Sequence, residues 1–199
     1  MGGKDTRQRI VEAAMELFWL KGFGSTSIAD ILSRSQVNSG SLYYFFPGKQ
    51  DVLIAVLEAY RDGISHWLLE PAWKGVDDPI DKVFALLAGY RRAIVDTDCE
   101  YGCPIGSIAL ELHEPDPAVR ELLAANFDAW VSAVEGCFAA AADRLPRDAD
   151  TRALAELTLN VMEGGVMQAR TYRDVAYFDR AVAQLRACIH ALMREPAKA

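Results

Sequence analysis

The sequence predicts an all-α protein of about nine helices. Apolar residues recur every three or four positions through almost the whole chain, and Pro, Asp or Gly bounds each such segment. No alternating pattern is long enough to indicate a strand, and the sequence has no internal repeat. With 199 residues, of which 51% are apolar and 25% charged, the chain can bury a sizeable core.

The first helix is expected over residues 5–21, with Asp5 as its N-cap and Gly22 at its end. Its apolar face consists of Ile10, Ala14, Leu17 and Phe18. Ser27 is followed three residues later by Asp30, which is a capping-box pattern. This pattern predicts that a second, short helix begins there.

A third helix is expected from about Ser39 to Phe46. Asn38 can cap its start, and the proline and glycine after Phe46 end it. Lys49 then begins a long helix that runs to about Leu69. The remaining helices are expected at 79–96, about 103–113, 116–144, 150–172 and 176–194.

Two short helices joined by a tight turn, after a longer bracing helix, have helix-turn-helix geometry, here over about residues 27–46. In this geometry the N-terminal end of the second helix meets the major groove of DNA. Ser39, Gly40 and Ser41 occupy that end. Small hydroxyls and free backbone N–H groups there can bind phosphates or base edges.

The four consecutive aromatic residues after this end, YYFF, are expected to divide between two faces. Tyr43 and Tyr44 lie nearer the groove, where their hydroxyls can bind phosphate. Leu42 and either Phe45 or Phe46 turn back into the small domain's core.

Charge is unevenly distributed along the chain. The net charge is -7, but residues 1–50 carry six Lys/Arg against four Asp/Glu and the rest of the chain is acidic. Contact with a polyanion is therefore expected only in the first fifty residues. Lys49, at a helix start, is placed for a phosphate contact, whereas Arg7 can reach phosphate or remain a solvated charge.

The run RIVEAAMELFWLKGFGSTSIADILSRSQVNSGSLYYFFPGKQDVLIAVLE, residues 9–58, resembles the DNA-binding domain of TetR-family transcriptional regulators. The matching signatures are AA-x-x-LF, the KGF turn, T-[ST]-I-x-x-I, V-x-x-G-x-L-Y-x-F-F and the following K-x-x-L. One departure is Gln36, where the family usually has glycine, and a positive φ at this residue costs about 1 kcal/mol.

The resemblance implies a DNA-binding domain over residues 4–64 and a divergent effector-binding and dimerisation domain over residues 65–199. The family contacts operator DNA at the positions of Ser27, Ser39, Gly40, Ser41, Tyr43, Tyr44 and Lys49. For Tyr44 the alternative is a partly buried packing role, and for Gly40 it is close packing between the two short helices.

Two apolar stripes favour a homodimer. Apolar residues in the last expected helix recur at spacings of 4, 3, 4 and 3. A set of residues in the helix before it alternates between spacings of three and four in the same way. The two sets are Phe178, Val182, Leu185, Ile189 and Leu192, and Leu154, Leu157, Val161, Gly164 and Gln168. Such seams are typical of paired helices, and small residues allow close approach. The alternative is that both stripes face a core within the chain.

A mainly apolar effector cavity is expected between the middle helices. Large side chains without strong polar decoration would line it, namely Trp67, Trp73, Phe84, Tyr90, Phe127, Trp130 and Met162, with Cys103 at its wall. Each of these residues has core packing as its alternative role.

Cys103 is followed by a proline suited to the first turn of a helix, so this thiol stands at a helix N-terminus. Such a position can make a thiol nucleophilic, and GCPIGSIALE resembles a TetR subgroup with a Gly-Cys opening to this helix. Cys103 is therefore either a sensor of electrophiles or oxidants, or a small buried packing residue. Cys99, Cys103 and His113 are a weak metal pattern, and no metal is expected.

The predicted function is that of a ligand-responsive regulator that represses from a palindromic operator as a homodimer and is released by a small apolar or amphipathic effector. No cofactor and no membrane contact are expected, and the N-terminus MGGKDTRQR lacks an apolar signal core, which favours the cytoplasm. An enzyme is disfavoured because the sequence has no phosphate loop, nucleophile elbow or HExxH motif. A second alternative is a helical adaptor that binds only protein.

Overall fold

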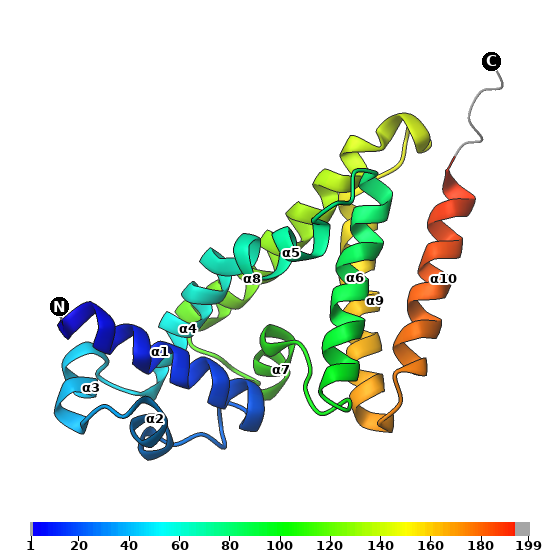
Figure 1. Ribbon diagram of the computed structural model, residues 1–199. Coiled ribbons are helices and arrows are strands. Elements are labelled where there is room, and N and C mark those ends of the chain that lie inside the picture. The colour runs from blue at the N-terminus through cyan, green and yellow to red at the C-terminus, as the bar shows by residue number, and fades with distance from the viewer. Residues whose placement is uncertain (1, 194–199) are drawn as a thin grey trace. The chain divides into compact units, whose positions relative to one another are not determined.

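The computed structural model describes residues 2–193, and these residues form helices and connecting loops without a strand (Figure 1). The helices are α1 Gly2–Lys21, α2 Ile28–Ser35, α3 Ser39–Phe45, α4 Lys49–Ile64, α5 Glu70–Trp73, α6 Pro79–Asp96, α7 Pro104–Glu111, α8 Pro117–Ala140, α9 Thr151–Tyr172 and α10 Ala176–Leu192. A π-helical turn, Ser65–Leu69, joins α4 to α5, and a 3₁₀ turn, Ala142–Arg144, follows α8. The all-α prediction is confirmed.

Two helix ends differ from the sequence prediction. α1 begins at Gly2, so Asp5 lies in its first turn instead of capping it, a place where its charge still favours the helix dipole. The long helix from Lys49 does not stop near Leu69 but continues to Trp73 through the π-helical turn. In this wider turn the N–H of Glu70 donates to the carbonyl oxygen of Ser65, five residues back. Pro71 lies in the first turn of α5, where the missing N–H of proline costs no hydrogen bond.

The expected helix caps are present. The Ser27 hydroxyl oxygen accepts from the N–H of Asp30 at 3.1 Å, and the Asp30 carboxylate accepts from the N–H of Ser27 at 2.9 Å. The Ser27 hydroxyl also donates to the Asp30 carboxylate. This bond, the bond from the Ser27 N–H and the bond from Lys21 lower the pKa of Asp30 from 3.8 to about 2. The Asn38 side chain caps α3 by accepting from the N–H of Ser41, and Gln36, where the family usually has glycine, has a φ of 54°.

The chain forms two compact units. Among residues 2–193, the first unit contains residues 2–63 and Cys103–Phe127, and the second contains Ile64–Gly102 and residues 128–193. Residues 103–127, which the sequence places in the effector domain, thus pack with the N-terminal helices: Ile105 and Ile108 share a core with Ile10 and Leu42. In the second unit, α6, α9 and α10 pack on one another around a separate core.

Candidate nucleic-acid interface

The third helix presents two different faces. Leu42 is fully buried and Phe46 nearly so, and both share a core with Ile31. Tyr43 is 53% exposed and Tyr44 is 82% exposed. The aromatic run therefore divides between core and surface as predicted, and Tyr44 does not take the buried packing role.

The N-terminal end of α3 is open to solvent. Asn38 Oδ1 accepts from the N–H of Ser41 at 2.8 Å, while Ser39 and Gly40 are exposed. Within residues 2–193, the hydroxyls of Ser39, Ser41, Tyr43 and Tyr44 have no hydrogen-bond partner. A Cβ at Gly40 would meet only Asn38 Oδ1, at an ordinary 3.5 Å, so packing between α2 and α3 does not require this glycine. α3 can therefore offer four hydroxyls to a polyanion, two from the serines at its N-terminal end and two from the tyrosines further along the helix.

Two predicted DNA contacts also have partners inside the unit. The Ser27 hydroxyl donates to Asp30 Oδ2 at 2.6 Å, so donation to a phosphate requires this bond to open. Lys49 Nζ donates to the carbonyl oxygens of Phe23 at 2.8 Å and Thr26 at 2.9 Å. An ammonium group has three donors, so one remains for a phosphate.

Two arginines of α1 support the helix-turn-helix segment. Arg9 Nη2 donates to the carbonyl oxygens of Ser35 at 2.6 Å and Gln36 at 3.0 Å, at the C-terminal end of α2. This cation satisfies orphan carbonyls beside the strained Gln36. The guanidinium carbon of Arg7 lies 5.3 Å from the centre of the Phe46 ring. Sequence reasoning missed Arg9, because its partners are 26 and 27 residues away and no local pattern points to them.

The residues predicted to line an effector cavity fall in both units. Cys103 and Phe127 belong to the first unit, and Cys103 is only 9% exposed. Phe84, Trp130 and Met162 are buried in the core of the second unit, against which Trp73 and Tyr90 pack. Trp67, in contrast, is 51% exposed.

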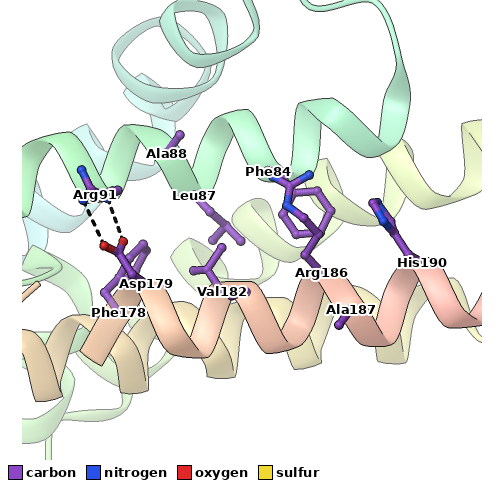
Figure 2. Close-up of a pocket in the computed structure, with 11 residues that line it drawn as sticks. Phe84, Leu87, Ala88, Arg91, Phe178, Asp179, Val182, Arg186, Ala187 and His190 are labelled. Carbon is purple, nitrogen blue, oxygen red and sulfur yellow. Dashed lines mark hydrogen bonds and ion pairs between the residues drawn. The ribbon is translucent and has the colours of Figure 1, made fainter. Parts of the chain in front are cut away.

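A groove of about 470 Å³ runs between α6 and α10 in the second unit (Figure 2). Phe84, Leu87 and Val182 give it an apolar floor, and the guanidinium carbon of Arg186 lies 3.7 Å from the centre of the Phe84 ring. At one end Arg91 is paired with Asp179, a bond that raises the pKa of Arg91. The groove suits a small amphipathic molecule, and of the predicted cavity residues Phe84 lines it.

The two stripes predicted for dimerisation differ in exposure. Phe178, Leu185 and Ile189 are buried in the core of their own chain, so their side chains are not available to a partner. Val161, Gly164 and Val182 are half-buried, whereas Leu157 and Leu192 are exposed. The surface left for a partner is therefore narrower than the stripes suggest.

The structure adds two negative findings for the described residues. No group of three or more His, Cys, Asp and Glu side chains in residues 2–193 could hold a metal ion. Over the same residues, no helix has both the length and the apolar character needed to span a bilayer.

Comparisons with known proteins cover both halves of the chain. The family model of bacterial regulatory proteins, tetR family, matches residues 10–56, and that of the LmrA/YxaF-like transcriptional regulator C-terminal domain matches residues 79–184. An uncharacterised HTH-type transcriptional regulator of Mycobacterium tuberculosis, Rv0196, is 30% identical over 185 residues, covering 90% of this chain and 92% of that protein.

Two further similarities are informative. The HTH-type transcriptional repressor DhaR of Mycobacterium sp. strain GP1 is 24% identical over 176 residues, 87% of each chain. The crystal structure of a TetR transcriptional regulator from Chloroflexus aurantiacus superposes with a TM-score of 0.81 at 25% identity, covering 98% of both chains.

Proposed function

Because this chain belongs to the TetR family of transcriptional regulators, we propose that it is a repressor that binds a palindromic operator as a homodimer and is released by a small effector. The observation that carries the proposal is the outer face of α3. Ser39, Gly40, Tyr43 and Tyr44 are exposed on this face and Ser41 is half-buried. Leu42 and Phe46 hold the helix to the core from the other side. We expect a cytoplasmic location and no catalytic activity.

The direction of control and the dimer rest on different support. A similar protein is named a repressor, which favours repression here. A single helix-turn-helix reads few base pairs, and a two-fold dimer places two recognition helices in major grooves about 34–36 Å apart. The exposed Leu157 and Leu192, on α9 and α10, supply apolar surface for such a dimer.

The effector is proposed to be apolar or amphipathic. The groove between α6 and α10 combines an apolar floor with Arg186 and His190, which favours a molecule that carries an acidic group. Binding of effector and operator must be reciprocal, so an effector that weakens operator binding tenfold itself binds about tenfold more weakly to the DNA-bound dimer.

A thiol trigger at Cys103 is the second candidate. Cys103 is the N-cap residue of α7, the position that can activate a thiol, but its small exposed fraction limits access by an electrophile. We therefore favour a reversible effector.

The test of DNA binding is a fluorescence-anisotropy titration with duplexes from the region flanking the gene. Tyr43→Ala should weaken binding of the best duplex by about 1–3 kcal/mol, while the protein stays folded and dimeric. Val95→Ala is the control, since Val95 is 46% exposed on α6 in the second unit and belongs to neither predicted dimer stripe. A clean dimer that shifts no duplex would favour the protein-binding adaptor, and equal affinity of wild type and Tyr43→Ala would mean that α3 is not the reading helix.

A further inference from the structure

Glu111, the last residue of α7, is bound to the loop that joins α1 to α2. Its Oε2 accepts from the N–H of Phe23 at 2.8 Å, and its Oε1 accepts from the N–H of Gly24 at 2.5 Å. One carboxylate thus holds two consecutive backbone donors that lie 88 and 87 residues away in the sequence. Charge-assisted bonds of this kind are stronger than those between neutral groups.

The same loop is held from its carbonyl side by Lys49. This side chain takes the Phe23 and Thr26 carbonyl oxygens, and its ammonium lies 4.3 Å from the centre of the Phe23 ring. Phe23 is therefore bound through its N–H to Glu111 and through its carbonyl to Lys49. The loop ends at Ser27, the N-cap of α2, so two proposed phosphate contacts stand at its edges.

The Glu111 carboxylate occupies the space in which a side chain at Gly24 would begin. A Cβ at Gly24 would lie 2.6 Å from Glu111 Oε1, and the next atom in reach is Glu111 Cδ at 3.7 Å. The φ of Gly24 is not in the left-handed region, so alanine would fit the backbone. Gly24 and Glu111 are thus matched to each other.

The segment that carries Glu111 is tied to the first unit at a second point. Asn126, buried on α8, donates from Nδ2 to the carbonyl oxygen of Leu57 on α4 at 3.0 Å and to that of Leu122 at 2.8 Å. With Ile105 and Ile108 in the core, this bond fixes the segment against α4. Glu111 therefore projects from a firmly held helix and can define the position of an exposed loop.

We propose that Glu111 is a positioning residue for DNA binding, whose carboxylate holds residues 22–26 in the form that aligns Lys49 and Ser27 with the phosphate backbone. The inference rests on the proposed operator binding and deepens it. Net charge argues in the opposite direction, because an acidic side chain repels DNA and its neutralisation alone strengthens binding. A loss of affinity on neutralising Glu111 is thus a signature of positioning.

The experiment measures operator affinity of the full-length protein as a function of salt for Glu111→Gln, Gly24→Ala and the double variant. In Glu111→Gln an amide NH₂ replaces one acceptor and faces a backbone N–H, whereas in Gly24→Ala the new methyl group expels the intact carboxylate. Each variant should bind about tenfold more weakly, with a salt slope lower by about one, because the Lys49 phosphate contact is lost.

The double variant tests whether the two substitutions release the same contact, and a charge control tests whether the loss of a negative charge alone changes the affinity. If both substitutions act by releasing the same contact, the double variant binds no more weakly than either single one, whereas independent effects multiply. Glu114→Gln removes the same charge from a neighbouring exposed residue with no hydrogen bond in the described chain, and it should leave affinity equal or slightly higher. Amide exchange at residues 23 and 24 should also accelerate in Glu111→Gln.

The proposal fails if Glu111→Gln keeps wild-type affinity and salt slope, if the two effects multiply, or if affinity falls only in proportion to the unfolded fraction. Failure of the wild type to bind any duplex is a different result, since it overturns the proposed function itself.

Discussion

The adjacent glycines of α9 test which surface meets the second copy in the proposed dimer. A Cβ at Gly164 would have no atom of the described chain within 4 Å, whereas a Cβ at Gly165 would lie 2.9 Å from Cδ2 and 3.4 Å from the Cα of Phe178 on α10. Alanine is favoured over glycine in a helix interior by about 1 kcal/mol, and overpacking costs about 1–3 kcal/mol. Gly165→Ala should therefore destabilise the chain by up to about 2 kcal/mol.

Gly164→Ala should have a different effect if α9 lies against its copy in the dimer. The methyl group then enters the closest helix contact, and the dimer dissociation constant should rise by about tenfold, as expected for about 1.4 kcal/mol. Gly165→Ala should lower the unfolding temperature by about 2–4 °C for each kcal/mol and leave the dissociation constant unchanged.

Sedimentation equilibrium gives the dissociation constant, and thermal unfolding at two protein concentrations gives the stability. A Gly164→Ala protein that is more stable and equally dimeric would remove Gly164 from the interface. A Gly165→Ala protein with wild-type stability would refute the close packing of α9 on α10.

Three further outcomes are expected. Lys49→Ala should weaken binding to all duplexes and lower the salt slope by about one, because a phosphate contact is lost. It should also lower the unfolding temperature, because two carbonyl oxygens lose their donor. An unchanged salt slope in the titration would exclude the phosphate contact. The lowered pKa of Asp30 stabilises the folded chain at pH values above 3.8, the pKa of the unfolded state, and this contribution is lost as the pH falls towards about 2. The unfolding temperature of Asp30→Asn should therefore fall less over this pH range than that of the wild type. Cys103→Ser should retain release by a reversible effector and lose any release by an electrophile in the anisotropy assay; an unaltered electrophile response would leave Cys103 with a packing role.

The sequence predicted those features that depend on neighbouring residues. The capping box of Ser27 and Asp30 and the cap at Asn38 were readable, because each involves residues within three positions. The division of the α3 aromatics was also readable, since helical spacing alone decides which side chains share a face with Leu42.

The features that escaped prediction depend on residues far apart in the chain. Nothing local marks Glu111 as the partner of Phe23 and Gly24, because exposed glutamates near a helix end are common and hydrogen bonds to backbone leave no sequence pattern. The inclusion of 103–127 in the first unit has the same origin, since apolar side chains such as Ile108 do not indicate which helix they cover.

The stripe on α10 shows how one pattern can fit two structures. Spacings of three and four residues place Leu185 and Ile189 on one face of the helix. Contact with a core within the chain and contact with a partner helix require the same spacing. In this chain both side chains are buried in its own core. In the proposed dimer, the partner surface would then lie beside them, where Leu192 and, on α9, Leu157 are exposed and Gly164 has open space. A dimer built there keeps the core of each chain intact, so dissociation should expose little buried apolar surface and leave a folded monomer. Dilution below the dissociation constant should thus weaken operator binding without loss of helical circular dichroism, whereas unfolding on dilution would show that the core residues themselves form the dimer contact.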